Sequence, residues 1–329
     1  MNYIGSKKKL LTFIESTIND NVPNISDKTF CDLFAGTGIV GNHFKDKVNK
    51  VISNDLEYYS YVLNRNYIGN SNEIEDKEDY IKSLNNLPLI TDGFIYQNYC
   101  RGESDRQYFS DNNGQKIDTI RQGIENLKTG ISDDLYYFLL ASLLESADKV
   151  ANTASVYGAY LKDLKKTAQK DLILSSASFK LTDNPNDTYN LDSNELISKI
   201  DGDILYLDPP YNARQYGSNY HILNTIALYN EFIPKGVTGL PEYNRSKYCS
   251  KVSVIEEFES LIQNARFKYI FLSYNNEGLM SVKDVESIMS NYGTYKLVKK
   301  DYQRFKADKD KNRKFKAKKT EEYLHILIK

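Results

Sequence analysis

The strongest constraint on the fold is a unit near the N-terminus in which a glycine-rich turn separates two apolar segments. Residues 29–34, TFCDLF, predict a short buried strand, and residues 50–55, KVISND, predict a second strand that ends at an acid. Between them, AGTG precedes a helical stretch that begins near Ile39. A strand, a glycine turn, a helix and a strand are typical of the start of a doubly wound parallel sheet, so an α/β fold is expected.

The alternation of strands and helices resumes in the C-terminal half of the chain. Strands are predicted at 203–208, 267–274, 294–300 and 322–329, and helices at 220–230 and 255–265. A helix is also expected at 56–67, directly after the second strand. These segments extend the α/β pattern over most of the sequence.

The alternation is interrupted by an acidic stretch that starts at about residue 71. The segment that follows is predicted to contain a strand at 93–99, a polar loop at 100–115, a helix with Ser132 as its N-cap and another helix at 155–166. We therefore expect one α/β domain formed by 1–70 and 171–329, with a mostly helical domain inserted at 71–170.

Cysteine usage and apolar runs favour the cytoplasm. Cys31, Cys100 and Cys249 are far apart and form neither a disulfide framework nor a metal-binding spacing. Glu15 interrupts the N-terminal apolar stretch, which argues against a signal peptide. The longest apolar run, at 135–144, is too short to span a bilayer.

Charge is nearly balanced over the whole chain but unevenly distributed. The net charge is −1, whereas Lys296 to Lys319 contains twelve Lys or Arg against three Asp, a local charge of +9. The centre of this stretch, 306–319, lies between the last two predicted strands, where a hairpin loop is expected. Such a segment is compatible with contacts to nucleic acid and equally with a solvated loop.

The glycine turn has the spacing of a nucleotide-binding fingerprint. Gly36, Gly38 and Gly41 match G-x-G-x-x-G, and Asp55 follows Gly36 by nineteen residues, where an acid binds ribose hydroxyls. Asp32, at the end of the first strand, would repel a pyrophosphate but would suit the ammonium group of S-adenosylmethionine. A nicotinamide dinucleotide site and a packing turn without a ligand are the alternatives.

A second motif follows the strand at 203–208, where Asp208, Pro209, Pro210 and Tyr211 form DPPY. The prolines fix the backbone and carry no N–H group, so the turn presents a carbonyl oxygen. Together with the Asp208 carboxylate, that oxygen is suited to accept hydrogen bonds from an amino group on a heterocyclic base, while the Tyr211 ring stacks on the base. A purely structural Pro-Pro turn is the alternative.

With these motifs in order, the chain resembles DNA N6-adenine methyltransferases of the alpha class, to which the Dam methylases belong. The order is YIGSK at 3–7, DLFAGTG at 32–38, an insertion, then DPPY at 208–211. The similarity covers essentially the whole chain. Two longer stretches, DPPYNARQYGSNYH and VANTASVYGAYLK, resemble Type II restriction-modification methylases more specifically. The composition, rich in Asn, Lys, Ile and Tyr, favours an AT-rich coding genome, and the resemblance implies a bacterial or phage source.

The resemblance implies a Rossmann-like, S-adenosylmethionine-dependent fold: a mostly parallel seven-stranded sheet whose last strand is antiparallel. The domain at 71–170 would then recognise the DNA target, and 1–70 with 171–329 would be catalytic. S-adenosylmethionine is the implied cofactor. The residues implied to line or approach it are Lys7, Asp32, Phe34, Ala35, Gly36, Gly38, Asp55, Leu56, Asp192 and Asp208. For Asp192, a helix cap before NELISKI is the alternative.

The implied reaction is direct methyl transfer to adenine N6, with the base flipped out of the duplex and stacked on Tyr211. Asp208 and the Pro209 carbonyl would orient the amine, and no covalent enzyme intermediate is needed. No metal is expected, because His43, His221 and His325 are scattered, and His221 is expected to be structural.

Contacts to double-stranded DNA are expected mainly from the insertion and from the segment after DPPY. The candidates for reading bases or holding phosphates are Arg101, Arg106, Tyr108, Asn112, Lys116, Arg214 and Tyr220. Further side chains that extend this set are Asn113, Gln115, Arg121, Asn152, Tyr157 and Lys162. The lysines of 306–319 would attract phosphates without regard to sequence.

Several other functions are compatible with parts of the pattern. Methylation of adenine in RNA or of cytosine N4 would use similar chemistry, and a nicotinamide-dependent oxidoreductase would leave DPPY without a role. A non-catalytic nucleic-acid-binding protein would be expected to have lost Gly36, Asp55 or Asp208, all of which are present. The protein is expected to be a monomer or weak dimer that acts beside a cognate restriction endonuclease.

Overall fold

A computed structural model describes residues 4–302 and 320–329, so the lysine-rich segment 306–319 lies outside the described residues. The chain forms two compact units. One is a helical unit made of 1–5, 57–181 and 216–244, and the other is an α/β unit made of 6–56, 182–215 and 245–329. The helical unit thus contains the expected insertion at 71–170 together with flanking residues and the separate segment 216–244.

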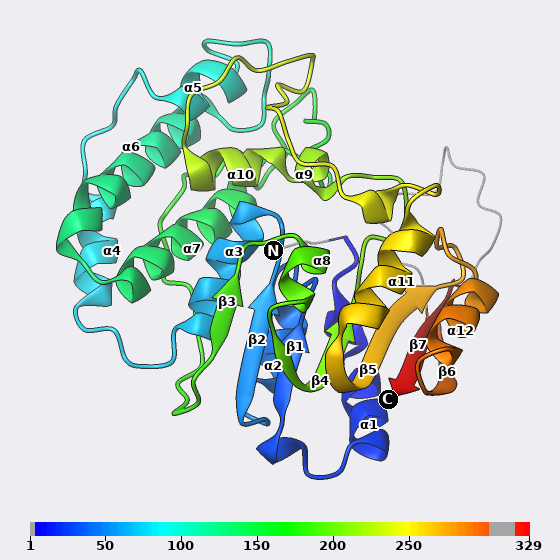
Figure 1. Ribbon diagram of the computed structural model, residues 1–329. Helices are drawn as coiled ribbons and strands as arrows, with labels where there is room; N and C mark the ends of the chain where they lie inside the picture. Colours follow the sequence, from blue (N-terminus) through cyan, green and yellow to red (C-terminus); the bar gives the residue numbers. More distant parts are fainter. Residues whose placement is uncertain (1–3, 303–319) are drawn as a thin grey trace. The chain divides into compact units, whose positions relative to one another are not determined.

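The α/β unit is built on a seven-stranded sheet with the order β3-β2-β1-β4-β5-β7-β6 in the described part of the chain (Figure 1). Its strands are β1 (Thr29–Asp32), β2 (Lys50–Asn54), β3 (Asp187–Tyr189), β4 (Asp201–Leu207), β5 (Arg266–Asn275), β6 (Thr294–Tyr302) and β7 (Thr320–Ile328). Strands β1 to β5 are parallel, and β7 pairs antiparallel with β5 and with β6. The expected mostly parallel sheet with an antiparallel last strand is confirmed.

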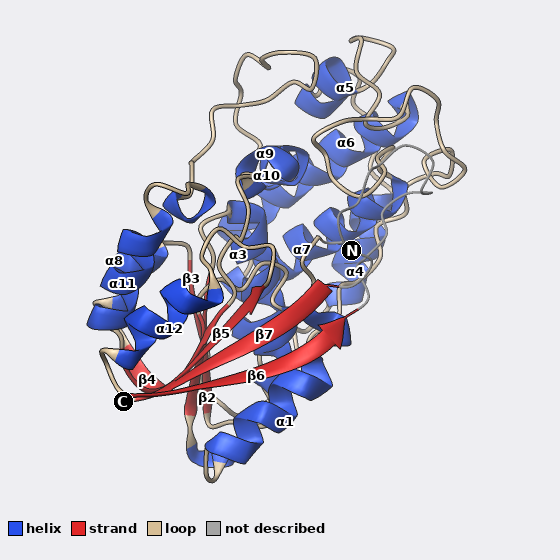
Figure 2. Ribbon diagram, turned by 90° about the vertical axis from the view of Figure 1, so that its right-hand side faces the viewer, coloured by secondary structure: helices blue, strands red, loops and turns tan. Residues whose placement is uncertain are grey.

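Helices cover both faces of this sheet, with α8, α11 and α12 on one side and α1 on the other (Figure 2). The helices of the unit are α1 (Leu11–Asn21), α2 (Ile39–Phe44), α8 (Ser193–Ile197), α11 (Val254–Asn264) and α12 (Val282–Ser290), with short 3-10 turns at Lys7–Lys9, Ile25–Asp27 and Lys247–Cys249. Strand β4 shows why both faces need cover. Leu205 and Leu207 belong to the core beneath α8, α11 and α12. Tyr206 points to the opposite face, where its ring centroid lies 6.3 Å from that of Phe30 in β1.

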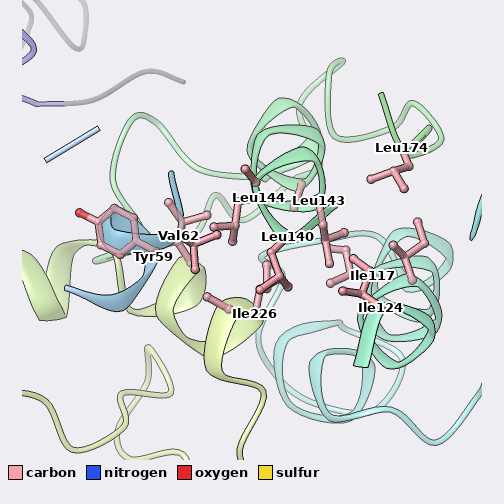
Figure 3. Packing of buried hydrophobic residues seen from close by; sticks show 14 of the residues in the cluster. Tyr59, Val62, Ile117, Ile124, Leu140, Leu143, Leu144, Leu174 and Ile226 are labelled. Atoms are coloured by element: carbon pink, nitrogen blue, oxygen red, sulfur yellow. The ribbon is translucent and has the colours of Figure 1, made fainter. Parts of the chain in front are cut away.

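The helical unit has a separate hydrophobic core, in which apolar side chains from α3, α6, α7 and α10 meet (Figure 3). Its helices are α3 (Tyr58–Asn64), α4 (Lys77–Asn85), α5 (Phe94–Tyr99), α6 (Asp111–Leu127), α7 (Asp133–Val150), α9 (Tyr216–Asn219) and α10 (His221–Leu228), with a π-turn at Arg65–Gly69 and a 3-10 turn at Lys128–Gly130. Leu140, Leu143 and Leu144 of α7 are fully buried. Each such side chain contributes about 2 kcal/mol of burial free energy.

The N-cap predicted for α7 is confirmed. The Ser132 hydroxyl accepts a hydrogen bond from the Leu135 N–H group, and Asp133 and Asp134 occupy the first turn, where the positive end of the helix dipole favours acids.

The strand predicted at 93–99 is wrong, because these residues form helix α5. The Asp118 carboxylate of α6 accepts hydrogen bonds from the Ile95 and Tyr96 N–H groups at 2.9 and 2.8 Å. These groups lie in the first turn of α5, where the helix leaves N–H groups without internal acceptors. The contact with Asp118 is a tertiary interaction that the local sequence does not reveal.

The helix predicted at 155–166 is also wrong, and the polar loop predicted at 100–115 is shorter than expected because α6 begins at Asp111. Residues 155–166 form an irregular segment organised by the buried Asn152. Its side-chain amide donates to the Leu161 carbonyl at 2.9 Å and accepts from the Lys165 N–H group at 3.0 Å. These bonds satisfy backbone groups that a helix would otherwise pair with each other.

Across the residues that the structure describes, no helix combines the length and the apolar character that crossing a membrane requires.

Candidate active site at the carboxyl edge of the sheet

The glycine motif and DPPY lie at the carboxyl ends of two neighbouring parallel strands. Asp32 of β1 pairs in register with Tyr206 of β4, and the Leu33 N–H group donates to the Tyr206 carbonyl at 3.2 Å. Asp208 follows Tyr206 by two residues on the same strand path. Open α/β sheets bind ligands at this edge, so the two motifs form one candidate site within the α/β unit.

The turn after β1 requires glycine at two positions. Gly36 and Gly38 have φ values of 53° and 73°, in the left-handed region that residues with a Cβ atom rarely adopt. The Gly36 N–H group donates to Asp55 Oδ2 at 2.7 Å, and the Gly41 N–H group donates to Asp32 Oδ2 at 2.9 Å. The structure therefore brings together the glycines and both acids that the sequence spacing singled out.

Asp32 carries a carboxyl group whose charged form is disfavoured by its surroundings. The side chain is buried, and this burial raises the pKa of Asp32 to about 8, with the Gly41 hydrogen bond opposing the shift and the negative charges of Asp208 and Asp55 adding to it. A carboxyl group in such a position gains free energy when a cation is placed beside it.

Two asparagines hold the end of β2 in place, and neither was singled out from the sequence. The buried Asn54 side chain donates to the Leu33 and Leu191 carbonyls and accepts from the Leu191 N–H group. Asn190 donates to the Asp55 carbonyl at 2.8 Å and to the Leu56 carbonyl at 3.0 Å. A sequence signal was weak in both cases, because an asparagine beside a strand end is usually part of an ordinary turn.

The remaining residues expected near the cofactor have varied environments. Phe34 is half-buried with its ring edge-on to Tyr248 at 5.0 Å, and Ala35 donates from its N–H group to the Asn54 carbonyl. Asp192 is the N-cap of α8, where its carboxylate accepts from the Asn194 and Glu195 N–H groups. The helix-cap alternative for Asp192 thus describes its contacts, and a role toward the cofactor stays a prediction.

The DPPY turn is anchored on the neighbouring loop. Pro209 is buried, and the Tyr211 carbonyl accepts from the Leu279 N–H group at 3.1 Å. The Tyr211 ring is half-buried and lies edge-on to Tyr274, with ring centroids 6.3 Å apart. The turn is thus held at Tyr211 by a backbone hydrogen bond and by ring packing.

Lys7 occupies the space between Asp208 and a carboxylate from the far end of the chain. Its ammonium lies 3.1 Å from Asp208 Oδ1 and 2.6 Å from Glu322 Oε1, and 5.7 Å from the centroid of the Tyr211 ring. Asp208 Oδ1 is buried and has no partner with hydrogen-bond geometry among the described residues. Lys7 thus lies beside DPPY, and its expected role toward the cofactor stays a prediction, whereas Glu322 was missed because nothing local marks it.

The seven side chains expected to contact DNA fall into three groups. Tyr108 and Tyr220 are buried: the Tyr108 hydroxyl donates to the Tyr157 carbonyl, and the Tyr220 hydroxyl accepts from the Ile4 N–H group. These tyrosines support the helical unit from inside, so the expectation that they contact DNA is not carried further. Arg101 and Arg214 are exposed.

Three other candidates use their polar groups within the helical unit. Arg106 donates to the Asn98, Gly236 and Val237 carbonyls, Lys116 donates to the Asn85 carbonyl, and Asn112 contacts Asp171. Within the wider set, four side chains are buried and hydrogen-bonded, whereas Gln115 and Lys162 are more accessible; the buried four are Asn113, Arg121, Asn152 and Tyr157. Contacts of the accessible residues with DNA stay predictions.

His221 has the structural surroundings expected from the sequence. It is buried, and its two ring nitrogens lie 3.0 Å from the Ser218 and Thr238 carbonyls. Burial lowers the pKa of His221. Within 4–302 and 320–329, no group of three or more His, Cys, Asp or Glu side chains is arranged to hold a metal ion.

The sheet order, the antiparallel last strand and the site at the carboxyl edge define a Rossmann-like methyltransferase. Within this class, residues 3–288 match the model of the D12 class N6 adenine-specific DNA methyltransferases, and the chain belongs to that family.

Curated relatives agree with this assignment. The chain is 61% identical to the Type II methyltransferase M.NlaIII of Neisseria lactamica, over 100% of this chain and 99% of the relative. It is 42% identical to the Type II methyltransferase M.CviAII of Paramecium bursaria Chlorella virus 1, over 93% of both chains. The Type II methyltransferase M.FokI of Planomicrobium okeanokoites is 40% identical over 93% of this chain, which spans 50% of that longer relative.

Proposed function

We propose that this adenine-specific DNA methyltransferase takes its methyl group from S-adenosylmethionine, acts on duplex DNA and protects its host as the modification enzyme of a Type II restriction-modification system. The family assignment supports the reaction, and the names of the relatives support the restriction-modification context. The observation that carries the proposal is the Asp208 carboxylate at the carboxyl edge of the sheet, one strand from the glycine turn, with its Oδ1 atom buried and 3.1 Å from the Lys7 ammonium.

The residues at the end of β1 fit the cofactor. Asp32 is a buried carboxyl group whose pKa is raised by burial, and the ammonium of S-adenosylmethionine would stabilise its ionised form. Asp55 would bind the ribose hydroxyls, while Phe34 and Leu56 would contact the apolar parts. When bound, S-adenosylmethionine supplies a methyl group on a positively charged sulfur, which makes the carbon electrophilic.

The residues of DPPY would act on the adenine amine. Its N6 lone pair is delocalised into the ring, and hydrogen bonds to Asp208 and to the Pro209 carbonyl would orient the amine and favour a more tetrahedral nitrogen. That nitrogen would bond to the methyl carbon as the carbon–sulfur bond breaks, and the surplus proton on nitrogen would leave to solvent. The protein contributes alignment and electrostatics rather than a covalent intermediate.

Access to the amine requires that the base leave the duplex. In paired DNA the adenine N6 group is engaged in base pairing, so enzymes that modify it flip the nucleotide into a pocket. Tyr211 is positioned on the same turn as Asp208 and would stack on the flipped base. Exposed Arg214, three residues further on, is suited to hold a neighbouring phosphate.

The test is transfer of a radioactive methyl group from S-adenosylmethionine to duplex oligonucleotides. Asp208→Ala should lower the rate of transfer by about 100- to 1,000-fold while leaving cofactor binding largely intact. Asp201→Ala is the matched control, because Asp201 lies at the exposed start of the same strand. Unchanged transfer by Asp208→Ala, or loss of the folded state, would refute the proposed role of Asp208.

The DNA target is best identified in a host that expresses the protein. Sequencing of modified bases would report the recognition site and the methylated position, and digestion by a restriction enzyme of the same specificity should be blocked. Equal labelling of single-stranded RNA and duplex DNA in vitro would contradict the proposed substrate.

A further inference from the structure

A cluster of three charged side chains, with Lys7 and Glu322 buried and Asp208 18% exposed, connects the N-terminal turn, the DPPY strand and the last strand of the α/β unit. Lys7 lies in the turn Lys7–Lys9, Asp208 follows β4, and Glu322 is in β7. The Lys7 side chain is 3% exposed and that of Glu322 is 7% exposed. A single ammonium therefore serves two carboxylates that are more than a hundred residues apart in the sequence.

The position of Glu322 is determined by the sheet. It pairs in register with Asn275 of β5 and with Lys300 of β6. The Lys300 ammonium lies over the Phe13 ring at 5.2 Å, and the ammonium group in ion-pair contact with Glu322 is that of Lys7. Glu322 therefore acts on Asp208 through their shared lysine and through its own negative charge.

The charges around Asp208 oppose each other. Lys7 favours the ionised carboxylate, whereas burial and Glu322 disfavour it, and Tyr206 of β4 adds a buried hydroxyl. A carboxylate that is tightly ion-paired with a lysine is a weaker hydrogen-bond acceptor for an incoming amine, because the ammonium draws electron density from the carboxylate oxygens. Sharing Lys7 with a second carboxylate reduces that withdrawal.

We propose that Glu322 is a positioning residue for methyl transfer: it holds the Lys7 ammonium against Asp208 while limiting how strongly Lys7 engages the oxygens that receive the adenine amine. This proposal rests on the proposed function. It assigns to the last strand a part in the site that the DPPY motif does not contain.

The arrangement makes opposite predictions for the two neighbours of Asp208. Burial raises the pKa of Asp208 to about 6, with Lys7 opposing the shift and Glu322 adding to it. Glu322→Gln keeps the side-chain shape and removes one negative charge, so the pKa of Asp208 should fall. Lys7→Met removes the cation, so the same pKa should rise. Each shift should be about one pH unit or more.

The experiment measures Asp208 directly and then through the reaction. Carboxyl ¹³C NMR of the free full-length protein would follow the titration of Asp208, assigned by the signal lost in Asp208→Asn. The rate of single-turnover methyl transfer would then be measured as a function of pH, and the acid limb of that pH–rate profile would report the same titration. Glu322→Gln should move the titration and the acid limb to lower pH and slow transfer at the optimum by about tenfold.

Glu321→Gln is the matched control, since it makes the same chemical change one residue away, where the carboxylate accepts from the Tyr323 hydroxyl. Its titration and acid limb should coincide with those of the wild type. If Glu322→Gln behaves like this control in a folded, active protein, the positioning role is wrong. If the wild-type protein itself transfers no methyl group, the proposed function fails instead.

Discussion

At the scale of single residues, the site gathers buried carboxylates whose mutual repulsion the fold must tolerate. Asp32 and Asp208 both have raised pKa values, chiefly because burial disfavours the charged form, and the negative charge of Asp208 adds to the shift of Asp32. Among the residues that the structure describes, Lys7 forms an ion pair with Asp208. Carboxyl groups with strongly shifted pKa values are common where a protein binds a charged ligand or stabilises charge that develops during a reaction.

The first prediction at this scale concerns Asp32 and pH. Its carboxyl group titrates near pH 4 in the unfolded chain and near pH 8 in the folded protein. Between these values the folded state holds the proton more tightly, so the free energy of unfolding falls as pH rises, by at most about 1.4 kcal/mol per unit. Asp32→Asn has no such proton. The difference in free energy of unfolding between this variant and the wild type should therefore shift in favour of the variant as pH rises from 5 to 7.5.

Urea unfolding at several pH values would measure this difference. Asp203→Asn is a suitable control, because its carboxylate lies at the start of β4, away from the glycine turn. Added S-adenosylmethionine should flatten the pH dependence of the wild type by stabilising the ionised carboxylate. Parallel stability curves for wild type and Asp32→Asn would contradict the buried, unpaired state of this acid.

At the scale of elements, single polar side chains decide what a segment becomes. The residues at 93–99 have an apolar pattern that suits a strand, but Asp118 on α6 caps them as a helix. The Tyr229 hydroxyl donates to the same carboxylate at 2.6 Å. One buried acid thus connects α5, α6 and the residue that follows α10.

Asp118→Ala should destabilise the helical unit by about 2–4 kcal/mol, because two N–H groups and a hydroxyl lose a charged acceptor in the interior. The loss should appear in urea unfolding followed by far-ultraviolet circular dichroism. Asp111→Ala, at the exposed start of α6, removes a contact with the Gly102 N–H group and should cost less than about 1 kcal/mol. Similar losses for the two variants would show that the Asp118 contacts contribute little.

At the scale of the whole molecule, each unit has a hydrophobic core of its own. Every residue expected to hold the cofactor, from Lys7 to Asp208, lies in the α/β unit. The residues proposed for base contacts in 101–116 lie in the helical unit. Cofactor binding is therefore expected to stabilise the α/β unit directly.

Thermal unfolding gives a test at this scale. A ligand present at a hundred times its Kd stabilises the folded state by about 2.7 kcal/mol. S-adenosylmethionine should therefore raise the Tm by several degrees, and S-adenosylhomocysteine should do the same. Nicotinamide dinucleotides should leave the Tm unchanged, because the buried Asp32 carboxyl group offers their pyrophosphate no positive charge. A rise with dinucleotides alone would overturn the cofactor assignment.

The sequence by itself determined the order of the main strands, the glycine turn and the place of DPPY. These features are local, because strands, left-handed turns and Pro-Pro steps depend on the types of a few adjacent residues. The spacing of Asp55 also carried information, because a strand–helix–strand unit of ordinary length brings that acid back to the turn.

Only the tertiary structure decided which distant side chains complete the site and which stay inside the core. Glu322 reaches Lys7 because β7 is inserted antiparallel between β5 and β6. Tyr108 and Tyr220 are buried because helices far apart in the chain pack around them. The fold of 93–99 likewise depends on an acid of another helix. The physical reason is the same throughout: burial and charge pairing act between residues that are neighbours in space, and a linear pattern records neighbours along the chain.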